Sequence, residues 1–327
     1  MTKHDYVRAF PGGVFAYAKH VSGWHQAGLA CLSVVVFALS AAPLELQRRI
    51  VNDAIGKGAF EPILWLALAY AGVALAEGAF KLVLNVYRGW VSEHAVLHLR
   101  TYIFSLKSIV PADGAPASAE TEGVDISMII SESVPIGGFV GISISEPLLQ
   151  GGILLSVFGY LVYLQPAMAL LCIAVFSPQL VFVPLIQRAV NRRAGERIQT
   201  LREVSGSIVA EAHGADAAPP VQEARIDHVF ELNMGIYKLK YTMNFLMNLM
   251  HHLGVACALG VGGWYAVKGQ IQVGTVVAFV SGLAKVNDPW GDLVNWYREM
   301  TEVRVRYQLV ADAVLSRPGI PAAQPAV

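Results

Sequence analysis

Charged residues are scarce in this sequence. Only 15% of its 327 residues are Asp, Glu, Lys or Arg, whereas 55% are hydrophobic and the mean hydropathy is +0.50. Soluble domains usually carry about a quarter of charged residues, so this balance excludes an ordinary soluble enzyme. The formal net charge is zero, and therefore no basic excess indicates nucleic acid as a partner.

Cysteine and ligand motifs are also sparse. Cys31, Cys172 and Cys257 lie far apart in apolar runs, without Cys-x-x-Cys or Cys/His spacing, and His251-His252 has no carboxylate or cysteine at ligand spacing. No G-x-x-x-x-G-K-[ST] motif occurs, so the sequence has no loop that would hold nucleotide phosphates. We therefore expect no metal site, no bound cofactor and no ATP hydrolysis by these residues.

Long hydrophobic runs, in contrast, are abundant. Six apolar stretches lie at residues 26–43, 63–86, 135–164, 166–184, 241–267 and 271–290. A bilayer core of ~30 Å needs ~20 helical residues, and each stretch reaches or nearly reaches that length. The sequence therefore predicts an all-α membrane protein with six transmembrane helices. Residues 11–23 precede the first span and are interpreted as a short interfacial helix or, alternatively, a disordered tail.

Basic residues are distributed unevenly among the predicted loops. Eight lie between spans four and five, and Arg100 and Lys107 lie between spans two and three. Arg48 and Arg49, between spans one and two, run against this trend. Cytoplasmic loops carry an excess of Lys and Arg. We therefore expect the loop between spans two and three, the loop between spans four and five, and both termini to be cytoplasmic.

The lengths of the predicted helices are informative. No proline interrupts residues 63–110, and 48 residues at 1.5 Å each would give a helix of ~72 Å, more than twice the bilayer core. Residues 185–218 could extend ~51 Å in the same way. The sequence thus predicts long cytoplasmic helical extensions that alternate with short external loops. Pro178 and Pro184 are expected to kink the fourth span.

Several sequence segments resemble the type 1 exporter transmembrane domain of ABC transporters. They lie at residues 42–55, 202–211, 223–233, 269–279 and 306–307, in the order and spacing of that family. The resemblance covers residues 24–316, with 1–23 as an N-terminal elbow segment and 317–327 as a Pro-rich linker or tail. It implies a domain-swapped dimer with a second transmembrane half, in the inner membrane. It also implies an ATPase chain or domain that binds ATP and magnesium.

The resemblance further implies two short coupling helices at the tips of the cytoplasmic extensions. Position in the chain assigns to them Pro111, Asp113, Glu211, His213, Gly214 and Asp216. Both tips depart from the family, because residues 112–119 are rich in small residues and Pro219-Pro220 ends any preceding helix. Two alternatives therefore stay open. One is an ATPase-free, proton-driven transporter on the same fold, resembling peptide-uptake proteins, and the other is a non-transporting membrane subunit.

Polar side chains gather in the inner half of the predicted spans. Most lie ~18 to 28 Å from the external ends, counted at 1.5 Å per residue. The set comprises Glu77, Lys81, Asn85, Glu146, Gln179, Asn244, Asn248, His252, Lys285 and Asp288. A charge facing lipid would cost about 2.5 to 3.5 kcal/mol, so we interpret the set as a solute cavity open to the cytoplasm. Alternatively, Glu77 with Lys81 and Lys285 with Asp288 are self-neutralising pairs that hold helices together.

Overall fold

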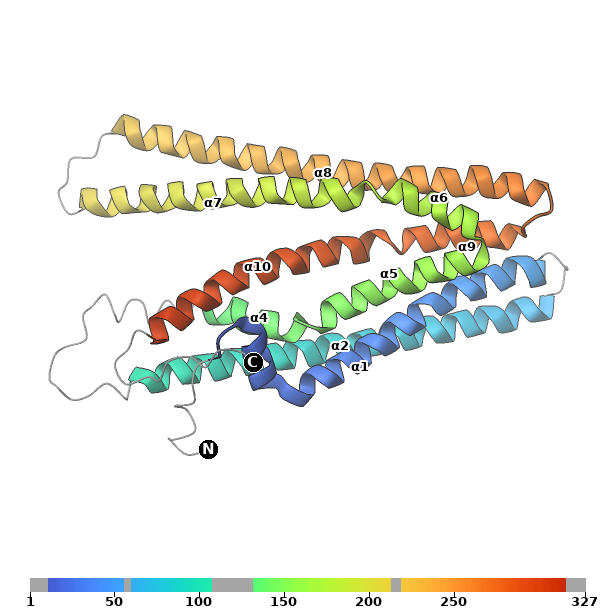
Figure 1. Cartoon of the computed structure of the whole chain (residues 1–327), viewed down its shortest axis with the longest axis horizontal. Helices are drawn as coiled ribbons and strands as arrows, with labels where there is room; N and C mark the ends of the chain where they lie inside the picture. Colours follow the sequence, from blue (N-terminus) through green and yellow to red (C-terminus); the bar gives the residue numbers. More distant parts are fainter. Residues whose placement is uncertain (1–10, 56–59, 108–131, 213–218, 316–327) are drawn as a thin grey trace. The chain divides into compact units, whose positions relative to one another are not determined.

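The computed structural model describes residues 11–55, 60–107, 132–212 and 219–315, and in these residues it is helical without strands. Its elements are α1 (Val14–Arg49), the π-helical turn η2 (Ile50–Ile55), α2 (Phe60–Lys107), α4 (Ser133–Ile142), α5 (Ser145–Leu164), α6 (Pro166–Phe176), α7 (Gln179–Ala212), α8 (Pro219–Val267), α9 (Val273–Ala284) and α10 (Asn287–Leu315) (Figure 1). The predicted all-α class is confirmed for the described residues.

Five helical stretches of the described chain are long and apolar enough to cross a membrane. They are Val14–Asp53, Glu61–Ser105, Ser133–Leu164, Pro166–Leu201 and Val221–Val267, and they contain most of the first five predicted spans. The sixth predicted span is divided between α9 and α10 by Lys285 and Val286. The 12 residues of α9 rise only ~18 Å, less than a bilayer core. A sixth span therefore stays a prediction.

The long helices predicted from the absence of proline are present. α2 contains 48 residues and α8 contains 49, so each rises ~72 Å or slightly more. Pro178 lies in the break between α6 and α7, as expected, whereas α7 continues through Pro184. In α1, Gly23 has φ +37° and separates a short first helical segment from the span that follows. The helix predicted within residues 11–23 is thus confirmed from Val14 onward.

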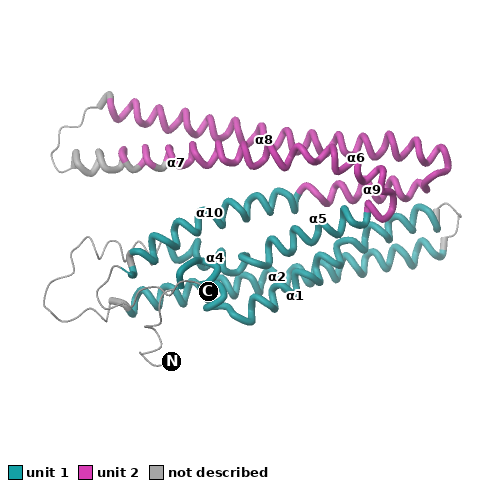
Figure 2. The backbone as a smooth tube through the Cα atoms, in the orientation of Figure 1, with its two compact units in different colours: residues 1–160, 288–327 teal, residues 161–287 magenta. Residues whose placement is uncertain are grey.

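The chain divides into two compact units, shown in different colours in Figure 2. Unit 1 comprises residues 1–160 and 288–327, and unit 2 comprises residues 161–287. In unit 2, α7 packs along α8, which also contacts α6 and α9. In unit 1, the core joins α1, α2, α4 and α10 through side chains that are at most 1% exposed, among them Tyr17, Leu99, Phe139 and Tyr307.

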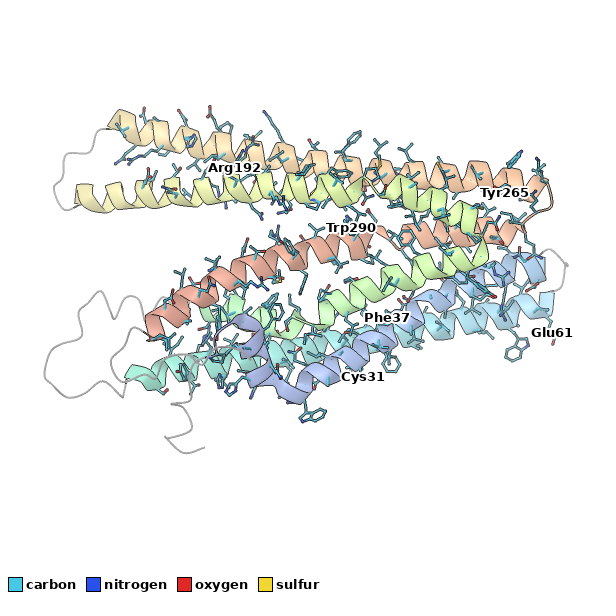
Figure 3. All side chains as sticks on the ribbon, viewed as in Figure 1. Cys31, Phe37, Glu61, Arg192, Tyr265 and Trp290 are labelled. Atoms are coloured by element: carbon cyan, nitrogen blue, oxygen red, sulfur yellow. The ribbon has the colours of Figure 1, made fainter. Side chains whose placement is uncertain are left out.

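Small residues let the helices of unit 1 approach closely. A Cβ at Gly141 would lie 2.5 Å from the Arg88 carbonyl oxygen, and one at Gly137 would lie 2.7 Å from the Val96 backbone nitrogen. Both distances are below normal contact, so α4 can lie against α2 only because these positions lack a side chain. Phe37 of α1, labelled in Figure 3, similarly occupies the space where Gly152 of α5 would carry a Cβ.

Candidate functional site

A buried arginine marks the candidate site. Arg88 is on α2, on the same face as Leu84, Val91, Ala95 and Leu99, which are all at most 2% exposed. Arg88 itself is only 8% exposed. An ionised side chain in such a position needs paired charges and hydrogen bonds, because burial removes its water.

The partners of Arg88 are at the beginning of α5. Arg88 Nη1 lies 2.5 Å from Glu146 Oε2, and Arg88 Nε donates a hydrogen bond of 2.8 Å to Ser145 Oγ. The Ser145 hydroxyl in turn donates to the Gly141 carbonyl oxygen at 2.9 Å. These contacts tie α2 to the break at Ser143-Ile144, where α4 ends and α5 begins. The break is thus held by a charge pair instead of by continuous helix hydrogen bonds.

Gln150 extends this network to a third helix. Its Nε2 donates to Glu146 Oε1 at 2.8 Å and to Asp292 Oδ2 of α10 at 2.9 Å. We call Arg88, Ser145, Glu146, Gln150 and Asp292 the Arg88 cluster. It contains two carboxylates and one guanidinium, and Arg88 Nη2 is buried without a hydrogen-bond partner. The arrangement can bind or move charge, and nothing in it forms a nucleophile with an adjacent base.

The predicted cavity residues of unit 1 lie on three helices. Glu77 is half-buried on α2, while Lys81 and Asn85 are exposed on the same helix, at the i, i+4 and i+8 positions that continue to Arg88. Asp288 is exposed in the first turn of α10. Glu146, on α5, belongs to the Arg88 cluster through its contacts with Arg88 and Gln150.

The predicted cavity residues of unit 2 are described separately. Gln179, the first residue of α7, is 3% exposed, and its Nε2 is buried without a partner. Asn244, Asn248 and His252 are exposed along one face of α8. Lys285 lies in the link after α9. The helix is interrupted at this link, and the Lys285–Asp288 pair stays a prediction.

Four members of the Arg88 cluster, all except Glu146, were not among the site residues predicted from the sequence. Ser145, Gln150 and Asp292 carry no motif, and their apolar surroundings in sequence do not reveal which helix each one meets. One signal was available: Gln150 is four residues after Glu146, and Asp292 is four residues after Asp288, which puts each on the same helix face as a chosen carboxylate.

Most of the predicted coupling residues lie outside the described residues. These are Pro111, Asp113, His213, Gly214 and Asp216. Glu211 is in the last turn of α7, and its side chain also lies outside the description. Their role in coupling stays a prediction.

A metal site was also considered for the described residues. No group of three or more His, Cys, Asp or Glu in that part of the chain is arranged to hold a metal ion.

The long apolar helices of the described residues indicate a multi-pass, all-α membrane protein, and comparisons with known proteins add a relationship. No family model matches the chain. It is 20% identical over 286 residues to the ATP-dependent lipid A-core flippase of Pectobacterium atrosepticum, and 19% identical over 286 residues to that of Yersinia pestis. Each alignment covers 83% of this chain and 48% of the relative.

A further relative is the uncharacterized ABC transporter ATP-binding protein YfiC of Bacillus subtilis. The chain is 20% identical to it over 299 residues, which cover 88% of this chain and 49% of the relative. The chain therefore spans about half the length of the curated relatives it matches. These similarities support a membrane component related to exporter-type ABC transporters.

Proposed function

We propose that this chain is the membrane-spanning permease subunit of an exporter-type ABC transporter in a bacterial inner membrane. The observation that carries the proposal is the similarity to ATP-dependent flippases across 83% of the chain. The chain would pair with a second transmembrane half, identical or related, in a domain-swapped dimer. A separate nucleotide-binding chain or domain would bind ATP and magnesium and drive alternating access.

The solute is proposed to be polar or amphipathic and to contact the charged residues of the inner half of the spans. Replacing Glu77 with Gln or Lys285 with Met should change solute affinity or selectivity, because each variant removes a charge without a large change in size. Glu61→Gln is a matched control, since Glu61 is an exposed carboxylate at the other end of α2. Uptake of a panel of fluorescent amphipathic dyes and lipids into inside-out vesicles provides the measurement.

Three results are informative in that experiment. A changed dye profile in the Glu77 and Lys285 variants, with normal membrane insertion, supports the proposed cavity. An unchanged profile would contradict it. Variants that fail only because the protein no longer inserts or folds would assign these charges to helix packing, which is the alternative reading of the same residues.

A second candidate function is a proton-driven transporter, and the Arg88 cluster contains evidence on both sides. A membrane carboxylate without a cationic partner would favour proton coupling, yet Glu146 is paired with Arg88. Asp292, just beyond the predicted sixth span, is the specific observation that favours protons. Its Oδ2 accepts a hydrogen bond from the neutral Gln150 side chain, which places a second ionisable carboxylate beside the Arg88–Glu146 pair.

The energy source separates the two functions. In vesicles, ATP-dependent uptake that persists after the proton gradient is dissipated supports the ATPase-driven transporter. Uptake that needs no ATP, follows an imposed proton gradient and is lost in Asp292→Asn would instead establish proton coupling. A chain that transports nothing under either condition, while inserted and folded, would be the non-transporting membrane subunit.

A further inference from the structure

Four of the nine histidines of the chain lie close together in unit 1. His20 and His25 are on α1, on either side of the kink at Gly23, and His94 and His98 are one turn apart on α2. Gly23 has a positive φ, a conformation that favours glycine, and so lets the chain change direction between the two α1 histidines. Both therefore reach the same stretch of α2.

Aromatic contacts join these histidines to α2. His25 Nδ1 lies 2.8 Å from the Tyr87 hydroxyl, within hydrogen-bond distance, and the His25 ring meets the Trp90 ring edge to face at 5.0 Å between centroids. Trp90 stacks on His94 at 5.3 Å. On the other side of the kink, His20 lies 6.2 Å from His98 between ring centroids. We call His20, His25, Trp90, His94 and His98 the histidine–tryptophan cluster.

Most of this cluster is open to its surroundings. His20, His25 and His94 are exposed, as is the neighbouring Lys19, and Trp90 is 50% exposed. Trp24, between the two α1 histidines, is 91% exposed. His98 is the exception: burial, followed by the charges of His20 and His94, lowers its pKa. Near the kink at Gly23 the two helices thus expose two indole rings, three imidazoles and one ammonium group.

The position of this surface along the chain corresponds to the membrane interface. Trp24 precedes the first predicted span by two residues, and Trp90 follows the second by four, which is ~3 and ~6 Å along a helix. The headgroup layer extends ~5 to 8 Å beyond the hydrocarbon core. Trp is enriched in this layer because its ring is apolar and its N–H is polar. Exposed indoles at this depth fit lipid better than a protein partner.

We propose that the histidine–tryptophan cluster and Lys19 bind the phosphate group of an anionic membrane lipid. Lys19 and the protonated forms of His25 and His94 would donate charge-assisted hydrogen bonds to phosphate oxygens, while Trp24 and Trp90 lie among the lipid chains and glycerol groups. The inference rests on the membrane placement proposed above. The negative potential of an anionic leaflet also concentrates protons, which favours the charged imidazoles.

Among the described residues, the other titratable groups near the cluster are few. On α2, Glu93 is adjacent to His94 but points ~100° away around the helix, and Arg100 lies further along. On α1, the Tyr17 hydroxyl donates a hydrogen bond to the Ala95 carbonyl oxygen, and its oxygen lies 3.4 Å from His98 Nδ1. From α10, Tyr307 packs on Tyr17, and Arg304 lies over Phe15. None of these contacts supplies a carboxylate directly to His25 or His94, so a phosphate is a complementary ligand for them.

A pH titration of lipid selectivity tests the proposal. The full chain is placed in nanodiscs of phosphatidylcholine with a minority of phosphatidylglycerol, and spin-labelled forms of each lipid report their relative association at about pH 8 and about pH 6, on either side of the ordinary histidine pKa of ~6.5. Phosphate raises the pKa of a histidine that it contacts, so binding strengthens as pH falls. We expect the preference for phosphatidylglycerol to rise about three- to tenfold, since one cation near an anionic surface contributes about fivefold.

Variants identify the residues responsible. The double variant His25→Gln/His94→Gln should lose the rise at low pH, and Lys19→Gln should lower the preference at both pH values. His228→Gln/His251→Gln on α8 is the matched control, because it removes two histidines elsewhere, outside the proposed solute cavity, and should keep the rise. Lys19→Gln changes an exposed residue, so it remains informative even if the double histidine variant does not fold.

Contradictory results are equally clear. Equal association of the two lipids, or a preference that does not change with pH in the folded wild-type chain, would overturn the proposal. The same would follow if Lys19→Gln and a folded double histidine variant matched the wild type. No ATPase or solute is present in the assay, so its failure would not count against transport, and a failure to transport would not count against the lipid site.

Discussion

At the scale of single residues, Arg88 is a buried and tightly paired side chain of unit 1. Its guanidinium is buried among apolar neighbours and is satisfied by Glu146 and Ser145, which leaves only Nη2 without a partner. Replacing a whole buried ion pair is often tolerated, whereas removing one partner leaves an uncompensated charge. The pair therefore holds α2 to α5 only as long as both members are present.

Single neutralisation of this pair should be destabilising. We expect Arg88→Gln and Glu146→Gln each to lower the stability of the folded chain by about 3 to 5 kcal/mol, because each leaves a buried charge unpaired. The double variant should recover part of that loss. Melting temperatures in detergent, followed by intrinsic fluorescence, provide the measurement. Glu61→Gln, at an exposed position at the other end of the same helix, is the control and should melt like the wild type.

Two outcomes would contradict this expectation. If either single variant melted like the wild type, the charge would be hydrated in the assembled protein. If the losses of the two single variants simply added in the double variant, Arg88 and Glu146 would act independently of each other.

At the scale of elements, the positions of proline explain why the length of α2 could be predicted and also why two helix breaks occur. The length of α2 was predicted because nothing between residues 63 and 110 interrupts a helix. The breaks at Ser143-Ile144 and at Lys285-Val286 were not predicted. Each begins at the fourth residue before a proline, Pro147 or Pro289, whose ring clashes with the carbonyl of that residue.

The limits of the site prediction are also physical. Helix periodicity places Glu77, Lys81, Asn85 and Arg88 on one face of α2, and the structure agrees with that spacing. Periodicity cannot tell which helix that face meets, so the contact of Arg88 with Glu146 could not be derived. The GxxxG spacing of Gly137 and Gly141 permits close helix approach, and α4 does lie close to α2 at both glycines.

That close approach leads to a prediction at the scale of the element. Gly141→Ala should destabilise the protein by about 1 to 3 kcal/mol, because the new methyl group would overlap the Arg88 carbonyl oxygen and the Ser92 hydroxyl. Gly138→Ala, three residues earlier on the same helix, is a matched control, since nothing lies within 4 Å of its Cβ position. Melting temperatures distinguish the two variants, and equal values would show that α4 and α2 are not in close contact.

At the scale of the whole molecule, the distribution of basic residues predicts the orientation of the chain. A fluorescent reporter that matures only in the cytoplasm should be active when it is fused after residue 327, because the loops rich in Arg and Lys are expected on the cytoplasmic side. A reporter active only in the periplasm should stay silent at the same position. The reverse pattern would show that the number of spans or their direction is different.

Coupling to an ATPase is the central claim of the account. The most direct test purifies the chain from native membranes and measures Mg-ATP hydrolysis by the complex, with and without replacement of residues 211–216 by a Gly/Ser linker. The account predicts a stoichiometric nucleotide-binding chain or domain, ATP-driven transport in the wild type, and transport uncoupled from hydrolysis in the replaced variant. Purification of an active transporter that hydrolyses no ATP, and that moves solute along a proton gradient, would contradict it.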